Sequence, residues 1–234
     1  MHILLQEEYP EANPEAGYET RFRCYKLGEK GSLWLRIMVN GKQVHASTPD
    51  DEVNSYRYAI KFLGEADEFL PNKYSGKNPL FEPSYSTLEM TKHDKNVDSV
   101  NIVPGTDVSY IDCRVLPEYN LDDILDDLRS IAKSDRYGKV RIEIEQFKRE
   151  DAAQITSPDS EIVKLIESAV IDIRHITTKK SGIGGGTCAA FARRAGMDAV
   201  AWSTSAEVAH QPNKYARISD IINDAKVLTY ICLE

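Results

Sequence analysis

Alternating apolar and polar residues in several short segments limit the fold of this chain more than any other feature. The clearest of these segments are 32–39, 108–115 and 140–144. Their period is that of a strand with one buried face, and another strand is expected to end near Val103. Asn40-Gly41 follows the first segment and predicts a hairpin turn, with residues 42–46 as the returning arm that carries His45.

Two helical patterns separate these strands. The apolar stripe of the first is Val53, Tyr56, Ile60, Leu63, Ala66 and Leu70, and that of the second, after the N-cap Asn120, is Leu121, Ile124, Leu125, Leu128 and Ile131. Residues 71–95 are expected to form a long connection. The order β-α-β-β-α-β predicts a ferredoxin-like sandwich. Both helices should cover one face of its sheet, so that the other face carries Trp34, Arg36, Asp112 and Arg114.

The pattern changes after residue 150. The expected elements are a helix from about residue 159, a glycine-rich turn at 182–187, a helix from the N-cap Thr187 to Gly196, a short buried strand at 199–202 and a last helix from Ser219. One or two strands cannot form a sheet that is covered on both faces. We therefore predict an α/β (α+β) protein with a connecting segment at 1–29, a ferredoxin-like unit at 30–149 and an incomplete αβα portion at 150–234.

Charge and cysteine content exclude several classes of function. The net charge of -8 over 234 residues argues against nucleic acid or an anionic membrane as the main partner. No secretory signal or membrane-length apolar run is evident. The cysteines form no C-x-x-C pair, which argues against a thiolate zinc cage or a redox motif: Cys24, Cys113, Cys188 and Cys232. These features favour a cytoplasmic protein with reduced thiols.

Two histidines in short polar segments suggest metal-assisted hydrolysis. They are His45, within 41–49, and His210, within 209–215. A lone histidine beside a turn is more often solvated or bonded within the core, so neither residue decides the matter alone. Arg114 likewise has a second interpretation, as an exposed sheet arginine paired with Asp112. The glycine-rich turn lacks the Gly-Lys-Ser/Thr ending of a phosphate-binding loop.

Six segments together resemble one family of proteins, the zinc-dependent aminoacylases, succinyl-diaminopimelate desuccinylases and carboxypeptidases G. The segments are 29–35, 41–49, 101–105, 112–117, 184–187 and 209–215. Each is weak alone, but all six occur in the family's order and extend the resemblance from about Glu29 to Glu234. It implies a lid that forms a homodimer, inserted in a catalytic domain with two zinc ions.

The resemblance implies a role for each matching residue. His45 resembles the lid histidine that reaches across the dimer and stabilises the oxyanion. Asn101 and Arg114 resemble lid residues that hold the terminal carboxylate of the substrate. His210 resembles a zinc ligand. The turn that lines the substrate pocket is represented by Gly185, Gly186 and Thr187.

The sequence also departs from the family. In the family, the first zinc ligands are a His-x-Asp pair and an Asp, the general base lies in a Glu-Glu pair, and all of them precede the lid. In this chain, no His-x-Asp occurs before residue 29. Glu7-Glu8 lacks the following small residues and is interpreted as a chance match. Lys214 stands where members usually have a glutamate, and Cys188 begins a stretch in which many have Asp and Arg. The acyl group and amino acid of the substrate are therefore left open.

These observations favour a metallohydrolase that cleaves an amide bond in N-acyl amino acids or small peptides. In this interpretation the chain lacks the first half of the catalytic domain, is inactive alone, and requires that half from elsewhere. The alternative is a non-catalytic dimerisation or regulatory module descended from such an enzyme. A peptide-binding ferredoxin-like domain would require the six matches to be accidental.

Overall fold

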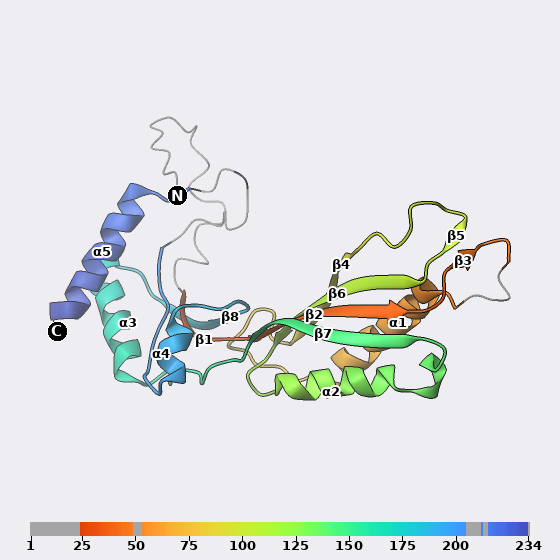
Figure 1. Cartoon of the computed structure of the whole chain (residues 1–234). Coiled ribbons are helices and arrows are strands. Elements are labelled where there is room, and N and C mark those ends of the chain that lie inside the picture. The colour runs from red at the N-terminus through yellow and green to blue at the C-terminus, as the bar shows by residue number, and fades with distance from the viewer. Residues whose placement is uncertain (1–23, 49–52, 205–211, 213–214, 234) are drawn as a thin grey trace. The chain divides into compact units, whose positions relative to one another are not determined.

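The computed structural model describes residues 24–48, 53–204, 212 and 215–233 (Figure 1). The chain divides into two compact units. One, which we call the sandwich unit, comprises residues 29–153 together with 183–186. The other, the second unit, comprises the described parts of 1–28, 154–182 and 187–234.

A four-stranded antiparallel sheet forms the centre of the sandwich unit. Its strands lie in the order β4 (Thr87–His93), β6 (Thr106–Val115), β2 (Gly31–Asn40) and β7 (Arg141–Glu150). Helices α1 (Ser55–Lys73) and α2 (Leu121–Ala132) lie on one face of this sheet, and a short 3-10 turn, η2 (Asp135–Tyr137), follows α2 (Figure 1). The predicted ferredoxin-like order β-α-β-β-α-β is confirmed.

Alternation along β2 separates a buried face from an open one. Leu33, Leu35, Ile37 and Val39 are buried, and they join residues of α1, α2 and β6 in one apolar core. Trp34, Arg36, Asp112 and Arg114 lie on the opposite face and are partly exposed, as predicted. The core therefore lies between the sheet and the helices, and the polar face is left open.

The predicted hairpin at Asn40-Gly41 is wrong. Strand β2 pairs with β6 and β7, whereas β3 (Val44–His45) pairs with β5 (Ile102–Val103) in a separate two-stranded ladder. A Cβ on Gly41 would lie 2.0 Å from the carbonyl oxygen of Val53. Glycine at this position therefore permits a close backbone approach and does not make a hairpin turn.

The second strand of the sandwich was also predicted in the wrong place. Strand β4 lies within residues 71–95, where we expected a connection, and the segment that ends at Val103 is β5. Only Leu88 of β4 is buried, so its sequence does not alternate as an internal strand does. Strand β4 is an edge strand, bonded to β6 alone.

Helix α1 buries part of the predicted stripe, Ala66 and Leu70, but not all of it. Its buried residues are Ser55, Ala59, Phe62, Ala66 and Leu70, behind the N-cap Asn54. Tyr56 and Ile60, which we expected in the core, are 45% and 55% exposed. In α2 the prediction is confirmed for Asn120 as N-cap and for four buried residues, Leu121, Ile124, Leu125 and Leu128.

The second unit contains three helices and a two-stranded sheet in its described residues. They are α3 (Glu161–Arg174), α4 (Ala189–Arg194), α5 (Ile218–Leu233), and the paired strands β1 (Cys24–Glu29) and β8 (Lys179–Ile183). Strand β8 was not predicted, and of the expected strand at 199–202 only Ala201 forms a bridge, to Lys26. The N-cap of α4 is Cys188, one residue after the predicted Thr187, while Gly196 has the expected positive φ of 81°.

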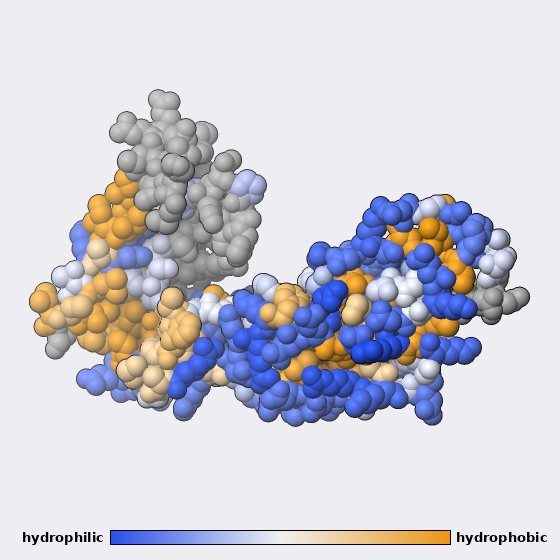
Figure 2. All heavy atoms as spheres, in the orientation of Figure 1, coloured by the Kyte–Doolittle hydropathy of each residue, from blue (hydrophilic) through white to orange (hydrophobic). Residues whose placement is uncertain are grey.

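Helix α5 turns its apolar side outward. Its exposed apolar residues recur at spacings of three and four, and we call them the α5 stripe: Ile218, Ile221, Ile222, Ala225, Leu228 and Cys232. Figure 2 shows apolar side chains gathered over this part of the chain. Toward α3 the helix is polar, because Arg174 lies 3.4 Å from a carboxylate oxygen of Asp224, and Val227 is the one buried residue described in α5. This polarity is the reverse of that of an ordinary surface helix.

None of the described helices is both long and apolar enough to cross a membrane.

Candidate functional site

His45 and Asn101 come together where β3 pairs with β5. The ring Nε2 of His45 lies 3.3 Å from the side-chain amide nitrogen of Asn101. The main-chain N–H of Ala46 donates to the carbonyl oxygen of Asn101 at 2.9 Å, which holds the two segments side by side. Both side chains are exposed. The pair therefore offers a histidine donor and an amide to a ligand that arrives from outside this unit.

Two serines complete this cluster, and the sequence pattern did not single them out. Ser47 Oγ lies 2.7 Å from His45 Nδ1, and the main-chain N–H of Ser47 donates to the same atom at 3.2 Å. Ser99 Oγ lies 2.5 Å from Asn101 Oδ1. Each serine stands two residues from its partner, a spacing at which small polar side chains bond locally. That spacing was the signal available in the sequence.

Arg114 lies at the other end of the sheet. Its Nε and Nη2 donate to the two carboxylate oxygens of Asp112 at 2.7 and 2.8 Å, a bidentate pair that fixes the guanidinium plane. Its Nη1 donates to the carbonyl oxygen of Gly184 at 3.4 Å. The paired-arginine interpretation is thus correct as a contact, and the side chain is still 27% exposed.

The glycine-rich turn approaches Arg114 closely. A Cβ on Gly185 would lie 4.0 Å from Arg114 Nη1, and one on Gly186 would lie 2.6 Å from a carboxylate oxygen of Glu150. Glu150 in turn pairs with Lys148 at 3.4 Å. Glycine at 186 therefore leaves room for that carboxylate, and the turn carries small residues beside an arginine. Thr187 belongs to the second unit.

These two groups of residues cannot meet within one chain. Thr106 of β6 lies opposite Asn40, near β5, and Arg114 lies opposite Ser32 at the far end of the same strand (Figure 1). Eight residues of antiparallel strand span roughly 27 Å. A small ligand that contacts Arg114 is therefore out of reach of His45 and Asn101 of the same sandwich unit.

The predicted metal ligand His210 lies outside the described residues. Within the described ranges, no group of three or more His, Cys, Asp or Glu side chains is arranged to hold a metal ion. The described residues therefore do not by themselves form the metal centre that the resemblance implies.

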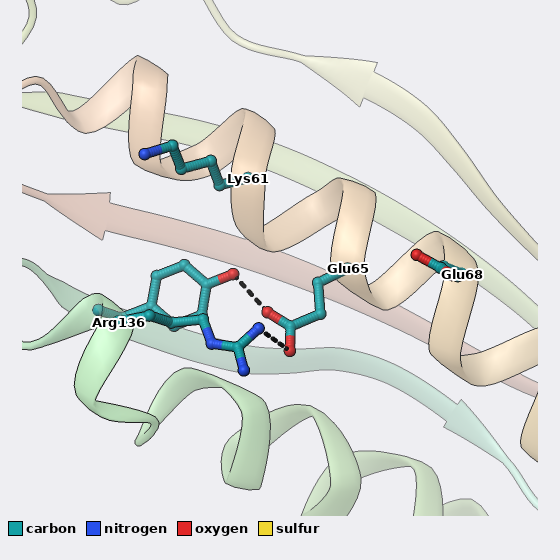
Figure 3. Close-up of a pocket in the computed structure, with 5 residues that line it drawn as sticks. Lys61, Glu65, Glu68 and Arg136 are labelled. Atoms are coloured by element: carbon teal, nitrogen blue, oxygen red, sulfur yellow. Dashed lines mark hydrogen bonds and ion pairs between the residues drawn. The ribbon is translucent and has the colours of Figure 1, made fainter.

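Two further groups of side chains in the sandwich unit make contacts within its fold. A hollow of about 390 Å³ is lined by Lys61, Glu65, Glu68, Arg136 and Tyr137, and Figure 3 shows how two of these side chains converge on Glu65. Glu65 accepts from Arg136 at 2.9 Å and from Tyr137 at 2.7 Å, which ties α1 to η2 on the helical side of the sheet. The ring Nε2 of His93 lies 2.8 Å from the buried carboxylate of Asp107.

The comparisons with known proteins agree with this fold. Residues 27–139 match the family model described as a peptidase dimerisation domain. An uncharacterised metallohydrolase of Methanocaldococcus jannaschii is 34% identical over 86% of this chain and 52% of its own length. A succinyl-diaminopimelate desuccinylase of Psychromonas ingrahamii is 24% identical over 84% of this chain and 49% of its own. The chain thus spans about half the length of these relatives.

Solved structures show the same fold at low sequence identity. An M20 family metallo-carboxypeptidase of Sulfolobus solfataricus has a TM-score of 0.69 at 17% identity, covering 88% of this chain and 59% of its own. The aminopeptidase PepT of Bacillus cereus also has a TM-score of 0.69 at 17% identity, covering 90% of this chain and 53% of its own. These structures resemble both units of the chain and extend beyond what the chain matches.

Proposed function

Because the chain belongs to the M20 family of metallohydrolases through its peptidase dimerisation domain, we propose that it serves in a metal-dependent amide hydrolase. The bond cleaved is that of an N-acyl amino acid or a small peptide. The sandwich unit is the lid and dimerisation domain, and the second unit is the carboxyl-terminal part of the catalytic domain. The remaining part of the catalytic domain corresponds to the half of the relatives that this chain does not match.

The observation that carries this proposal is the separation of His45 and Asn101 from Arg114 along β6. Each group has the chemistry of half a site: one offers neutral hydrogen-bond donors, and the other an arginine fork beside a small-residue turn. In a twofold dimer, the His45 end of one lid meets the Arg114 end that belongs to its partner. Each complete site then contains residues of two chains.

The described residues would act by binding and orienting the substrate. Arg114, held in plane by Asp112, pairs through its outer edge with the substrate carboxylate beside Gly185 and Gly186. His45 from the other chain donates to the oxygen on which negative charge develops during attack at the amide carbonyl. Zinc, with His210 among its ligands, would supply the activated water in the completed enzyme.

We place the dimer contact at β4 and the adjoining side of α1. Strands β4 and β7 form the two edges of this sheet, and charged residues dominate β7, whereas Met90 of β4 is apolar and 42% exposed. Tyr56 of α1 lies beside this edge, because its ring centroid is 5.6 Å from that of His93. Ile60 continues the apolar surface one turn later. A second copy that pairs with β4 would extend the sheet and cover these side chains.

The α5 stripe is the surface on which we expect the rest of the catalytic domain to pack. The stripe is apolar, lies opposite the polar contacts with α3, and has no cover among the described residues. The relatives are about twice as long as the part that this chain matches. An αβα portion with two described strands in its sheet needs further strands to cover such a helix.

A fused protein tests the proposed function. The part of the M. jannaschii relative that this chain does not match is joined to this chain, and hydrolysis of N-acetyl and N-succinyl amino acids and dipeptides is measured with added zinc. We expect turnover by the fused protein and none by the chain alone. His45→Ala should lower kcat by about a hundredfold or more, whereas Lys61→Ala, on the helical side, should not. Zinc-dependent turnover that is insensitive to His45→Ala would contradict the proposed role, and a zinc-loaded, folded fusion without turnover would favour the non-catalytic module.

A further inference from the structure

The imidazole of His45 has a hydrogen-bonding neighbour at each nitrogen. At Nδ1 lie the main-chain nitrogen of Ser47, at 3.2 Å, and the hydroxyl of the same residue, at 2.7 Å. At Nε2 lies the side-chain amide of Asn101, at 3.3 Å, and that amide is itself bonded to Ser99. A neutral imidazole has one donor nitrogen and one acceptor nitrogen. The two tautomers therefore make different hydrogen bonds with these neighbours.

The main-chain group decides which tautomer fits. The N–H of Ser47 points at Nδ1 and can only donate, since its direction is fixed by the backbone. A hydroxyl either donates or accepts, and a side-chain amide exchanges its oxygen and nitrogen by a half-turn. A proton on Nδ1 would face the N–H of Ser47 directly. A proton on Nε2 leaves Nδ1 free to accept from Ser47.

We infer that the main-chain N–H of Ser47 holds His45 as the tautomer with its proton on Nε2. The role of this tautomer in catalysis rests on the proposed function, in which Nε2 is the atom that donates to the substrate oxygen. In the free protein, Asn101 turns Oδ1 toward Nε2–H, and its NH₂ group donates to the Ser99 hydroxyl. Ser47 and Asn101 are then positioning residues, which keep the donor ready until a ligand oxygen takes the place of the amide.

The opposite tautomer would be unfit for this role. It would present the lone pair of Nε2 to an oxygen that is gaining negative charge, and the two would repel. Without a restraint on the ring, the fraction of molecules with the proton on Nδ1 could not donate from Nε2 to this oxygen. With the main chain as the restraint, the tautomer does not depend on the identity of the side chain at position 47.

Nitrogen NMR of the whole chain, labelled with ¹⁵N-histidine and recorded at a pH where the rings are neutral, tests this inference. His45→Gln identifies the His45 signals by their loss, and the exposed His175 serves as the solvated reference. We expect a pyrrole-type Nε2 and a pyridine-type Nδ1 for His45, with the Nε2–H form in excess by about tenfold or more, as the loss of one hydrogen bond implies. An Nδ1–H form, or the same mixture as His175, would overturn the inference.

Two variants separate the main chain from the side chains. Ser47→Ala retains the main-chain N–H, and Asn101→Ala retains the neighbours of Nδ1, so both should keep the Nε2–H signals. A change of tautomer in either variant would assign control to the side chain and overturn the role of the main chain. The readout needs neither metal nor turnover. The wrong tautomer in the NMR spectrum would contradict this inference alone. Full turnover by the His45→Ala fused protein would contradict the proposed function alone.

Discussion

The ring Nε2 of His45 lies 3.3 Å from the side-chain amide of Asn101, although 56 residues separate the two in the sequence. The contact exists because β3 pairs with β5, placing His45 opposite Ile102. Arg114, at the other end of β6, cannot take part. Within one sandwich unit, the residues that resemble the family's substrate-binding groups thus form two separate clusters.

A charged side chain at the proposed dimer contact should separate the subunits. Ile60→Asp, or Met90→Arg in the edge strand, would bury a charge without a partner between the two lids. We expect light scattering at micromolar concentration to give a dimer for the unchanged chain and a monomer for either variant. Phe147→Asp is the matched control, because Phe147 is 50% exposed on the open face of the sheet. A monomer for the unchanged chain, or for the Phe147→Asp control as well as the two contact variants, would count against the lid dimer.

The buried thiol of Cys113 should resist alkylation. Burial, followed by the nearby carboxylate of Asp112, raises the pKa of Cys113 from 9.0 to about 12, so the reactive thiolate is scarce. At pH 8, iodoacetamide should label the exposed Cys188 and Cys232 and leave Cys113 unlabelled, as read by peptide mass spectrometry. Cys113 labelled as fast as Cys188 would show that this strand is not buried in solution.

The same pKa shift has a consequence for stability at alkaline pH. Between 9.0 and about 12 the folded chain retains the Cys113 proton that the unfolded chain releases, so stability falls as the pH rises through this interval. Cys113→Ala should weaken that decline relative to the unchanged chain in urea unfolding at a series of pH values. An unchanged slope would contradict the assignment.

Two glycines should respond in opposite ways to alanine. Gly41→Ala places a methyl group against the main-chain oxygen of Val53, which cannot move as a flexible side chain does, and should cost about 2–4 kcal/mol. Gly64 lies exposed within α1 with nothing near its missing Cβ, and Gly64→Ala should stabilise the chain by about 0.5–1 kcal/mol. Urea unfolding of both variants checks the contrast, and equal effects would be inconsistent with the position of Gly41.

The sequence predicts some elements of the sandwich unit better than others. Alternation in β2 and β6 and the stripe of α2 predict those elements correctly, since their apolar residues face a core within the same unit. Edge strand β4 has one buried residue, so its pattern carries little signal. Tyr56 and Ile60 fit a core stripe by spacing, yet their side chains are exposed. Periodicity alone does not tell a buried apolar residue from an exposed one.

The site was predictable to a different degree. His45, Asn101 and Arg114 were selected by resemblance, and their grouping into two clusters depends on strand pairing that the Asn40-Gly41 pattern misrepresents. Ser47 stands two residues from His45, a spacing that permits a local contact but does not establish one. The main-chain N–H of Ser47 reaches Nδ1 only because of the backbone conformation, which the sequence pattern does not specify. His210 lies outside the described residues, and its role as a ligand stays a prediction.

Charges on the α5 stripe should reduce association of the chain without unfolding it. Ile221→Lys with Leu228→Lys alters exposed side chains, so we expect less self-association and weaker binding of a hydrophobic dye, with the unfolding free energy unchanged within about 0.5 kcal/mol. Val227→Ala, on the buried side, should instead cost about 2 kcal/mol and leave dye binding unchanged in the folded state. The fused protein, in which the stripe is covered, should lose turnover with the double lysine variant; full turnover would argue against this surface.

Complementation between two inactive variants tests the shared site most directly. In the fused protein, His45→Ala and Arg114→Ala should each abolish turnover, because each site takes His45 from one chain and Arg114 from the other. Co-expression of the two variants yields mixed dimers in which one of two sites is intact. With random pairing, we predict recovery of about a quarter of the unchanged activity. No recovery from mixed dimers, shown to be present by mass spectrometry, would place both residues in one chain's site and contradict the account.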